Sequence, residues 1–362
     1  MINDFIAYWA AARLLLTNGN AFLPAEQLEM QRSAGWTGST ALLMYYPPWT
    51  LSVFLPFGYF DYDTAQTLWF LQNSVFIFLG ALLLWRLYSN SPTPSRVGWV
   101  ALLTFAPIYF ALLMGQVGPL VLVGLIGFLL AARKQAWFWA GAWLALASIK
   151  PHLLTLLWIS ASLWVLWERQ WRLGAGFVSI FAIMVIVPTL WDRQIYATYM
   201  SVMSDRRVIL PTDWANPTIG TAVNVFLGGN FGWLRWLPTL AGVFWLLCYW
   251  QKNSKTWDWS VELPLIILVS VVTTPYAWTF DYVILLPALM QGAVWFGIAG
   301  NRQRVHWVSV IYLAISSIAL LAKIIVRNEF WYFWLAPALL VIYLLLRHEY
   351  KGVGADSISV PG

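Results

Sequence analysis

The chain has 362 residues, of which 60% are hydrophobic and only 10% are charged. Soluble globular chains carry about 45–50% apolar and about 25% charged residues, so this composition excludes an ordinary water-soluble protein and predicts a polytopic α-helical membrane protein. Basic loops at the anionic cytoplasmic face of a membrane explain the net charge of +6, so nucleic acid is not an expected partner.

The sequence offers little that could hold a metal or a redox cofactor. The single cysteine, Cys248, lies inside an apolar run and has no second cysteine with which to form a disulfide within the chain. The three histidines, His152, His306 and His348, are too far apart to show metal-ligand spacing. We therefore expect an activity without a bound metal or cofactor.

Apolar runs separated by charged or turn-forming residues predict about eleven transmembrane helices, because a helix needs roughly 20 mostly apolar residues to cross a bilayer. A shorter run at 49–60 contains Pro56 and Gly58, so we expect a re-entrant or interfacial helix there. We therefore expect one all-α transmembrane domain over 1–351 and a short flexible tail over 352–362. The predicted spans are 64–87, 97–114, 117–132, 136–149, 153–167, 173–190, 233–250, 261–275, 280–297, 306–326 and 330–346.

Basic residues give the predicted orientation, because cytoplasmic loops carry an excess of Lys and Arg. Placing the loop after Arg86 in the cytoplasm puts more than half of the Lys and Arg residues inside and most of the acidic residues outside. Two long segments, 1–63 and 191–232, then face outward, and the first contains an amphipathic stretch at 5–16 that would lie in the membrane plane. The sequence thus predicts a multi-pass protein of the cell membrane with its chemistry on the extracytoplasmic side.

The start of the chain does not fit this topology. An odd number of spans with the C-terminus inside leaves the N-terminus outside, yet the chain opens directly into the amphipathic stretch. We therefore expect a leading transmembrane helix encoded upstream of Met1.

Two charged residues of the outer side are the first candidates for chemistry. Asp4 precedes the amphipathic stretch, where either Asn3 or Asp4 could cap the helix, or Asp4 could act as a general base that takes a proton from an attacking hydroxyl. Lys150 ends an apolar run beside the helix-breaking Pro151. It could snorkel to the interface, but a cation at membrane depth also suits a phosphate.

Three more charged residues are candidates with an ordinary alternative. Arg206 and Arg207 lie side by side in the second outer segment, where they could form a weak solvated ion pair with Asp205 or clamp a phosphate. Asp281 enters an apolar run among aromatic residues, so it could cap a helix or bind substrate.

The string Asp61-Tyr62-Asp63 has the acid-x-acid form with which many sugar-nucleotide enzymes hold a metal. We do not expect a metal here, because Asp63 and Gln66 form a capping box at the start of a predicted span. The chain also has no soluble nucleotide-binding domain that could use the motif.

Several short motifs, taken in order, resemble glycosyltransferase family 87, whose members include polyprenyl-phosphate-sugar-dependent mannosyltransferases of the GT-C fold. The resemblance covers residues 4 to about 172, with a later echo at 274–287. It rests on Asp4-Phe5, Tyr8-Trp9-Ala10-Ala11, Gly19, Tyr46-Pro47-Pro48, Leu55-Pro56, Ala65, Leu68-Trp69, Gly115-Gln116-Val117 and Ile149-Lys150-Pro151.

The resemblance implies a GT-C-type bundle with outer-face interfacial helices and a catalytic carboxylate in the first outer loop, which Asp4 matches. It also implies a donor sugar on a lipid monophosphate and no obligatory metal. The chain departs from the mannosyltransferase branch at Trp278-Thr279-Phe280-Asp281, where that branch carries a histidine, so the acceptor or the sugar could differ. We expect Lys150, Arg206 and Arg207 to bind the donor phosphate, and the substrate-binding residues to be Tyr8, Tyr46, Gln116, His152 and Asp281.

These expectations combine into one reaction. Asp4 deprotonates an acceptor hydroxyl of a lipid or glycan, the oxygen attacks the anomeric carbon of a hexose, most simply mannose, and polyprenyl phosphate leaves. The alternative is a transporter or flippase of lipid-linked sugars, which would use the same cations. Transporters commonly show repeated halves and sites at the membrane midplane, whereas this sequence shows no internal repeat.

Overall fold

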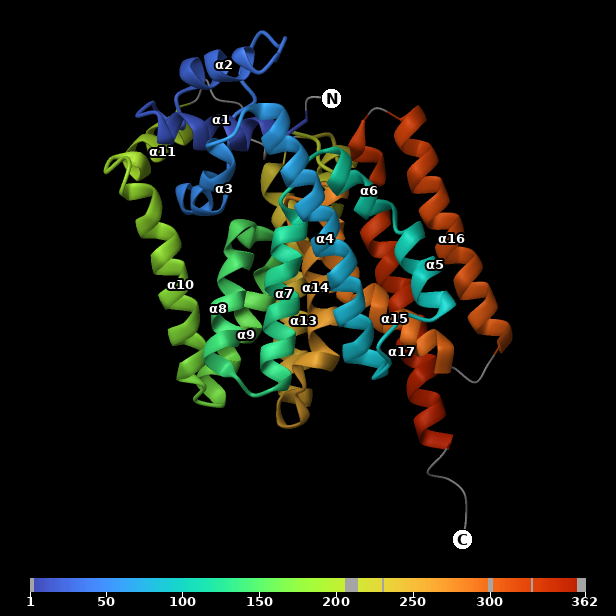
Figure 1. Cartoon of the computed structure of the whole chain (residues 1–362). Coiled ribbons are helices and arrows are strands. Elements are labelled where there is room, and N and C mark those ends of the chain that lie inside the picture. The colour runs from blue at the N-terminus through green and yellow to red at the C-terminus, as the bar shows by residue number, and fades with distance from the viewer. Residues whose placement is uncertain (1–2, 206–213, 230, 299–301, 327, 357–362) are drawn as a thin grey trace.

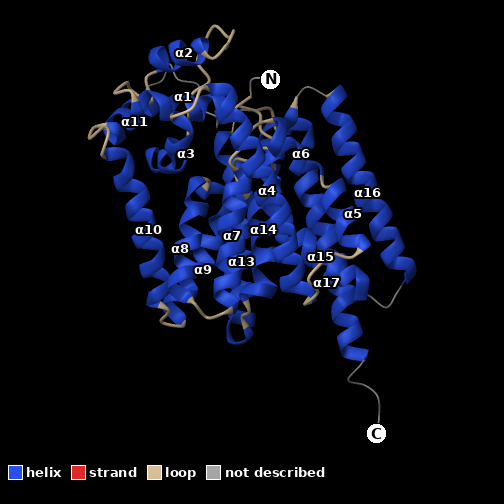
Figure 2. Cartoon of the chain, viewed as in Figure 1, coloured by secondary structure: helices blue, strands red, loops and turns tan. Residues whose placement is uncertain are grey.

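The chain is helical in a computed structural model that describes residues 3–205, 214–229, 231–298, 302–326 and 328–356. No strand occurs within these ranges (Figure 2). The all-α fold class predicted from the composition is therefore confirmed for the described part of the chain.

Most of the long helices form a bundle (Figure 1). Its members are α4 (Tyr62–Ser89), α5 (Arg96–Thr104), α6 (Ala106–Leu113), α7 (Gly118–Arg133), α8 (Trp137–Leu144), α9 (Thr155–Trp167), α10 (Trp171–Thr189), α13 (Leu237–Asn253), α14 (Trp259–Thr273), α15 (Leu286–Ile298), α16 (Arg302–Ile325) and α17 (Leu335–Asp356). Short 3₁₀ turns extend or join several of them, namely η2 (Ala145–Ile149), η3 (Pro151–Leu154), η5 (Gly232–Trp236), η6 (Ser254–Thr256), η7 (Thr279–Leu285) and η8 (Glu329–Tyr332).

A second group of helices covers one end of the bundle, which we call the α1 end (Figure 1). It consists of α1 (Phe5–Leu16), α2 (Pro24–Ser33), the turn η1 (Pro48–Thr50) with α3 (Leu51–Gly58), and α11 (Ile195–Ser204). A further short helix, α12 (Ile219–Phe226), packs against η5. The short helix expected at 49–60 is present as η1 and α3.

Helix α1 is not the amphipathic surface helix that the sequence suggested. Only Arg13 and Leu16 of its residues are not buried, because α2, α3 and α4 pack against it. Arg13 is held by a hydrogen bond of 2.9 Å to the carbonyl oxygen of Gly58 at the end of α3. The helix therefore lies inside the protein at the α1 end and has no exposed polar face, while its predicted position in the membrane plane stays a prediction.

Five helical segments are long and apolar enough to cross a membrane: Tyr62–Ser89, Trp171–Thr189, Thr279–Ile298, His306–Ile325 and Glu329–Lys351. The pair α5 and α6 would make a sixth, but it is bent by 46° at Phe105, just before Pro107 in the first turn of α6. The count of about eleven spans is not confirmed. Several predicted spans, including those at 117–132 and 261–275, form apolar helices of 10–17 residues, which is shorter than the roughly 20 residues of a full crossing.

The start of α4 decides between the metal and capping interpretations of Asp61-Tyr62-Asp63. The cap is Asp61, whose carboxylate accepts a hydrogen bond of 3.0 Å from the backbone N–H of Thr64. The capping box assigned to Asp63 and Gln66 is therefore wrong, since Gln66 instead donates to the Tyr62 hydroxyl. Asp61 satisfies a free N–H of the first turn, which explains the motif without a metal.

Candidate functional site

A cavity with a volume of about 1010 Å³ lies at the α1 end. Segments far apart in the sequence line it, and they include most of the residues singled out from the sequence. The charged and polar lining residues are Asp4, Tyr8, Tyr45, Tyr46, Gln116, Lys150, His152, Tyr199, Arg235, Tyr276, Asn328 and Glu329.

Asp4 directly precedes α1, but its side chain does not cap the helix. The neighbouring Asn3 takes that role, because its side-chain oxygen accepts a hydrogen bond of 3.2 Å from the N–H of Phe5. The Asp4 carboxylate instead accepts a hydrogen bond of 2.5 Å from the side-chain amide of Gln116. The capping alternative for Asp4 therefore fails, and the carboxylate is left at the cavity wall.

Gln116 lies in the tight turn between α6 and α7. The turn depends on Gly115, which has φ +65° and whose carbonyl oxygen accepts a hydrogen bond of 2.9 Å from the Trp69 indole. A side chain at Gly115 would also collide with Asn3, since a Cβ there would lie 2.6 Å from the Asn3 side-chain oxygen. The turn therefore brings Gln116 against the start of α1.

Lys150 stands between the turns η2 and η3, and its side chain is only 3% exposed. Its ammonium group donates to Gln116 Oε1 at 3.1 Å and forms an ion pair with Asp281. The rings of Tyr46 and Phe280 lie with their centroids 5.3 and 5.1 Å from the ammonium nitrogen. Lys150 is therefore enclosed by the protein and does not snorkel.

Asp281 caps a helical turn, as one of its two predicted roles requires, but its other contact is with Lys150. Its second carboxylate oxygen accepts a hydrogen bond of 2.8 Å from the backbone N–H of Trp278, so it caps the turn η7. Its first oxygen binds Lys150. Asp281 itself is 1% exposed and does not line the cavity, so the structure gives it a positioning role behind Lys150.

Tyr8 and Tyr46 meet at the same point. Their hydroxyl groups lie 3.5 Å apart, and both donate toward Gln116 Oε1, at 3.4 and 3.3 Å. The amide oxygen has two lone pairs and three donors within reach, counting Lys150, so one hydroxyl donates instead to the neighbouring tyrosine oxygen or to a bound molecule.

His152 lines the cavity next to Lys150, with its ring 5.2 Å from that of Tyr276. Its Nε2 atom is buried and has no hydrogen-bond partner among the described residues. Arg206 and Arg207 lie outside the residues that the structure describes, so their predicted phosphate-binding role stays a prediction.

Burial raises the pKa of the Asp4 carboxyl to about 6, and the hydrogen bond from Gln116 and the charge of Lys150 oppose a larger rise. A carboxyl group with this pKa is ionised at neutral pH and is still basic enough to take up a proton during a reaction. The environment therefore suits Asp4 to general-base catalysis.

Sequence reasoning did not single out two charged residues of the cavity wall. Arg235 lies in η5, directly before the N-terminus of α13. Its only signal in the sequence is its positive charge on the side of the membrane where the positive-inside rule does not expect one. Glu329 lies at the start of η8, where it forms an ion pair with Lys323 and accepts a hydrogen bond of 2.9 Å from Thr279. The carboxylate of Glu329 comes beside the cavity only through the packing of α16 and α17.

The cavity combines a carboxylate, an ammonium group and many aromatic side chains. The rings of Tyr45, Trp214 and Trp278 follow one another along its wall, with centroid separations of 6.0 and 5.9 Å. Among the described residues, no group of three or more His, Cys, Asp or Glu side chains is arranged to hold a metal ion.

Comparison with known proteins identifies the family. No curated protein and no solved structure matches the chain significantly. The profile of glycosyltransferase family 87 matches residues 44–275, which is more than half of the chain. The match includes Gln116 and Lys150 but not Asp4 or Asp281. The chain therefore belongs to glycosyltransferase family 87 and is a membrane glycosyltransferase.

Proposed function

We propose that the protein transfers a hexose, most simply mannose, from a polyprenyl-phosphate donor to a hydroxyl group of a lipid or glycan at the outer face of the cell membrane. One observation carries the proposal: the side-chain amide of Gln116 links the Asp4 carboxylate to the Lys150 ammonium on the wall of a single large cavity. Glycosyl transfer from a lipid phosphate needs a base for the acceptor and a cation for the leaving group, and these two groups supply both.

The reaction is a single displacement. Asp4 accepts the proton of the acceptor hydroxyl as its oxygen attacks the anomeric carbon. The bond between that carbon and the phosphate oxygen breaks, and polyprenyl phosphate leaves with the bonding electrons. Because only Asp281 and Gln116 accept from Lys150 among its described contacts, the third N–H of its ammonium group can bind the departing phosphate oxygen.

The remaining wall of the cavity suits the two substrates. Aromatic faces such as those of Tyr45 and Trp214 stack against the apolar faces of sugar rings, and Arg235 adds a second cation for the phosphate. The transport alternative has less support, because the chain belongs to a family of transferases and the cavity is confined to one end of the bundle.

The test is transfer of radiolabelled mannose from polyprenyl-phosphate-mannose in membranes that contain the protein. Asp4→Asn should lower the rate by about 10²–10⁴-fold, the usual contribution of a general base. Asp63→Asn is the matched control, because Asp63 is an exposed aspartate at the same end of the molecule, and its rate should be unchanged. Full activity of a folded Asp4→Asn variant would exclude Asp4 as the base. Transfer of another hexose in place of mannose would change the sugar and keep the mechanism.

A further inference from the structure

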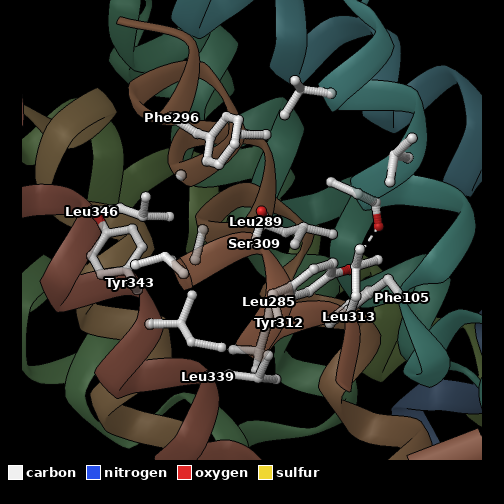
Figure 3. A pocket seen from close by; sticks show the side chains of 18 of the residues that line it. Phe105, Leu285, Leu289, Phe296, Ser309, Tyr312, Leu313, Leu339, Tyr343 and Leu346 are labelled. Carbon is white, nitrogen blue, oxygen red and sulfur yellow. Dashed lines mark hydrogen bonds between the residues drawn. The ribbon is translucent and has the colours of Figure 1, made fainter. Parts of the chain in front are cut away.

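A second cavity lies inside the bundle, between α5, α15, α16 and α17 (Figure 3). It has a volume of about 320 Å³, and we call it the lateral slot. Figure 3 shows Tyr343 and Leu346 on one side of it and Phe105 and Leu313 on the other. The slot shares no lining residue with the cavity that contains Asp4.

The walls of the lateral slot are apolar even where they contain hydroxyl groups. The Tyr312 hydroxyl donates to the carbonyl oxygen of Ala101 at 2.8 Å, and the Tyr343 hydroxyl donates to the side chain of Gln291. The Ser309 hydroxyl donates to the carbonyl oxygen of His306 at 2.7 Å. Since these groups already have partners, the slot offers water little to bind and suits a hydrocarbon chain.

Small residues and a helix break create the space. Gly292 on α15 lines the slot, and a Cβ there would lie 3.2 Å from a methyl group of Leu346, at the end of a flexible side chain. The break at Phe105 ends α5 after nine residues, so α5 borders the slot for about 14 Å at 1.5 Å per residue. Arg96 and Phe105 mark the two ends of this border.

The end of the slot at Arg96 favours a negative charge. Arg96 is exposed and is the only charged residue among the described side chains that line the slot. Helices α5 and α16 begin at Arg96 and Arg302, and Figure 1 shows both starting at the end of the bundle away from α1. Helix N-termini carry partial positive charge, so the N-terminus of α5 at Arg96 favours an anionic group.

We propose that the lateral slot binds one acyl chain of an anionic phospholipid, whose phosphate lies at Arg96 and the N-terminus of α5. The lipid comes from the leaflet on the side away from the Asp4 cavity, so this site is separate from the reaction and does not depend on the proposed donor. Because the acyl chain already lies in hydrocarbon before it binds, packing contacts with the walls of the slot retain it, while Arg96 selects the head group.

The experiment is native mass spectrometry of the purified protein after exchange into phosphatidylglycerol or phosphatidylcholine with identical acyl chains. The wild type should retain one phosphatidylglycerol and prefer it over phosphatidylcholine by about tenfold. Arg96→Gln should reduce that preference to less than about threefold. Gly292→Leu should fill the slot and lose the bound lipid, whereas the matched control Gly174→Leu should retain it, because a Cβ at Gly174 meets only Val165 at 3.9 Å.

Asp4→Asn should bind phosphatidylglycerol as the wild type does, which separates this site from the proposed catalytic role. Retention of no lipid by the wild type, or an unchanged preference in Arg96→Gln, would overturn the proposal. Displacement of phosphatidylglycerol by an equimolar amount of polyprenyl phosphate would assign the slot to the donor tail instead. The wild-type and Arg96→Gln measurements decide the question even if Gly292→Leu does not fold.

Discussion

The side chain of Gln116 has one orientation that its surroundings can accept. Its N–H₂ group donates to the Asp4 carboxylate, and its oxygen accepts from the Lys150 ammonium. Rotation of the amide by 180° would place oxygen against carboxylate and N–H₂ against ammonium, which leaves both contacts repulsive. Gln116 therefore fixes the spacing of the base and the cation and keeps them from forming a direct ion pair.

The reaction rate should depend on the ionisation of Asp4. Because a general base must be deprotonated, kcat/KM should fall about tenfold per pH unit below pH 6, the pKa of Asp4. Gln116→Leu removes a hydrogen bond that lowers this pKa, so the fall in kcat/KM at acidic pH (the acidic limb of the pH profile) should move to higher pH. Rate profiles between pH 4.5 and 8 measure both effects, and an identical limb in Asp4→Asn would show that another group causes it.

Two effects of Lys150 should be separable: its ion pair with Asp281 stabilises the fold, and its ammonium group supports transfer. Lys150→Met leaves the buried Asp281 carboxylate without a counter-charge, which should lower the free energy of unfolding by about 3–5 kcal/mol. The double variant Lys150→Met with Asp281→Asn removes both charges and should recover most of that stability without recovering transfer. Thermal unfolding and transfer assays on the same samples measure the two effects. Recovery of activity in the double variant would exclude Lys150 as the phosphate ligand.

The sequence identified several members of the site but not how they are connected. Lys150 stood out because a charge is costly at membrane depth. Asp4 stood out because it precedes the first outer helix and matches the family's catalytic carboxylate, and both residues line the cavity. The pairing of Lys150 with Asp281, which is 131 positions away, depends on how η2 and η7 pack, and no local pattern records it. Glu329 was missed for the same reason.

At the scale of helices, α8 and α10 cross closely enough for their backbones to touch. A Cβ on Gly141 of α8 would lie 1.9 Å from the carbonyl oxygen of Leu173, and one on Gly176 of α10 would lie 1.9 Å from that of Phe138. Small residues at such crossings allow close packing of helices inside a membrane. The two glycines therefore fix α10 against the rest of the bundle.

Gly141→Ala and Gly176→Ala should each destabilise the protein by about 3 kcal/mol or more, because backbone atoms would have to move apart to admit a methyl group. Gly174→Ala, two positions from Gly176, should have little effect, since a Cβ there meets only Val165 at 3.9 Å. Thermal unfolding in detergent measures all three. Equal stability of Gly176→Ala and Gly174→Ala would contradict the close crossing.

Helix positions were predicted better than helix environments. The hydrophobic runs predicted the ends of α4 and α10 to within about two residues, because a long apolar segment by itself indicates a helix. The spacing of Phe5, Tyr8 and Trp9 suggested one buried face for α1, but α2 and α3 fold back over its other side. Periodicity along one helix cannot reveal a covering layer supplied by later residues.

The two ends of the bundle differ. The Asp4 cavity lies at the α1 end, and the lateral slot starts at the other end. The orientation of the bundle axis in the membrane is testable with cysteines at two exposed positions, Glu29 on α2 and Lys134 after α7. In a Cys248→Ser background, a membrane-impermeant maleimide should label Glu29→Cys on intact cells. Lys134→Cys should react only after permeabilisation, and the reverse pattern would place the cavity in the cytoplasm.

The wide separation of the contacts around Lys150 also bears on how the protein is made. Asp4 is synthesised first and Asp281 late, and Lys150 emerges 131 residues before the carboxylate that pairs with it. At about 5–20 residues per second, the ribosome needs roughly 7 to 26 seconds for that interval. During this time the newly inserted lysine has no partner from η7, so it must stay hydrated at the membrane surface or be shielded by another protein. The turns η2 and η3 interrupt the helix on either side of Lys150, so the lysine does not emerge inside a continuous helix.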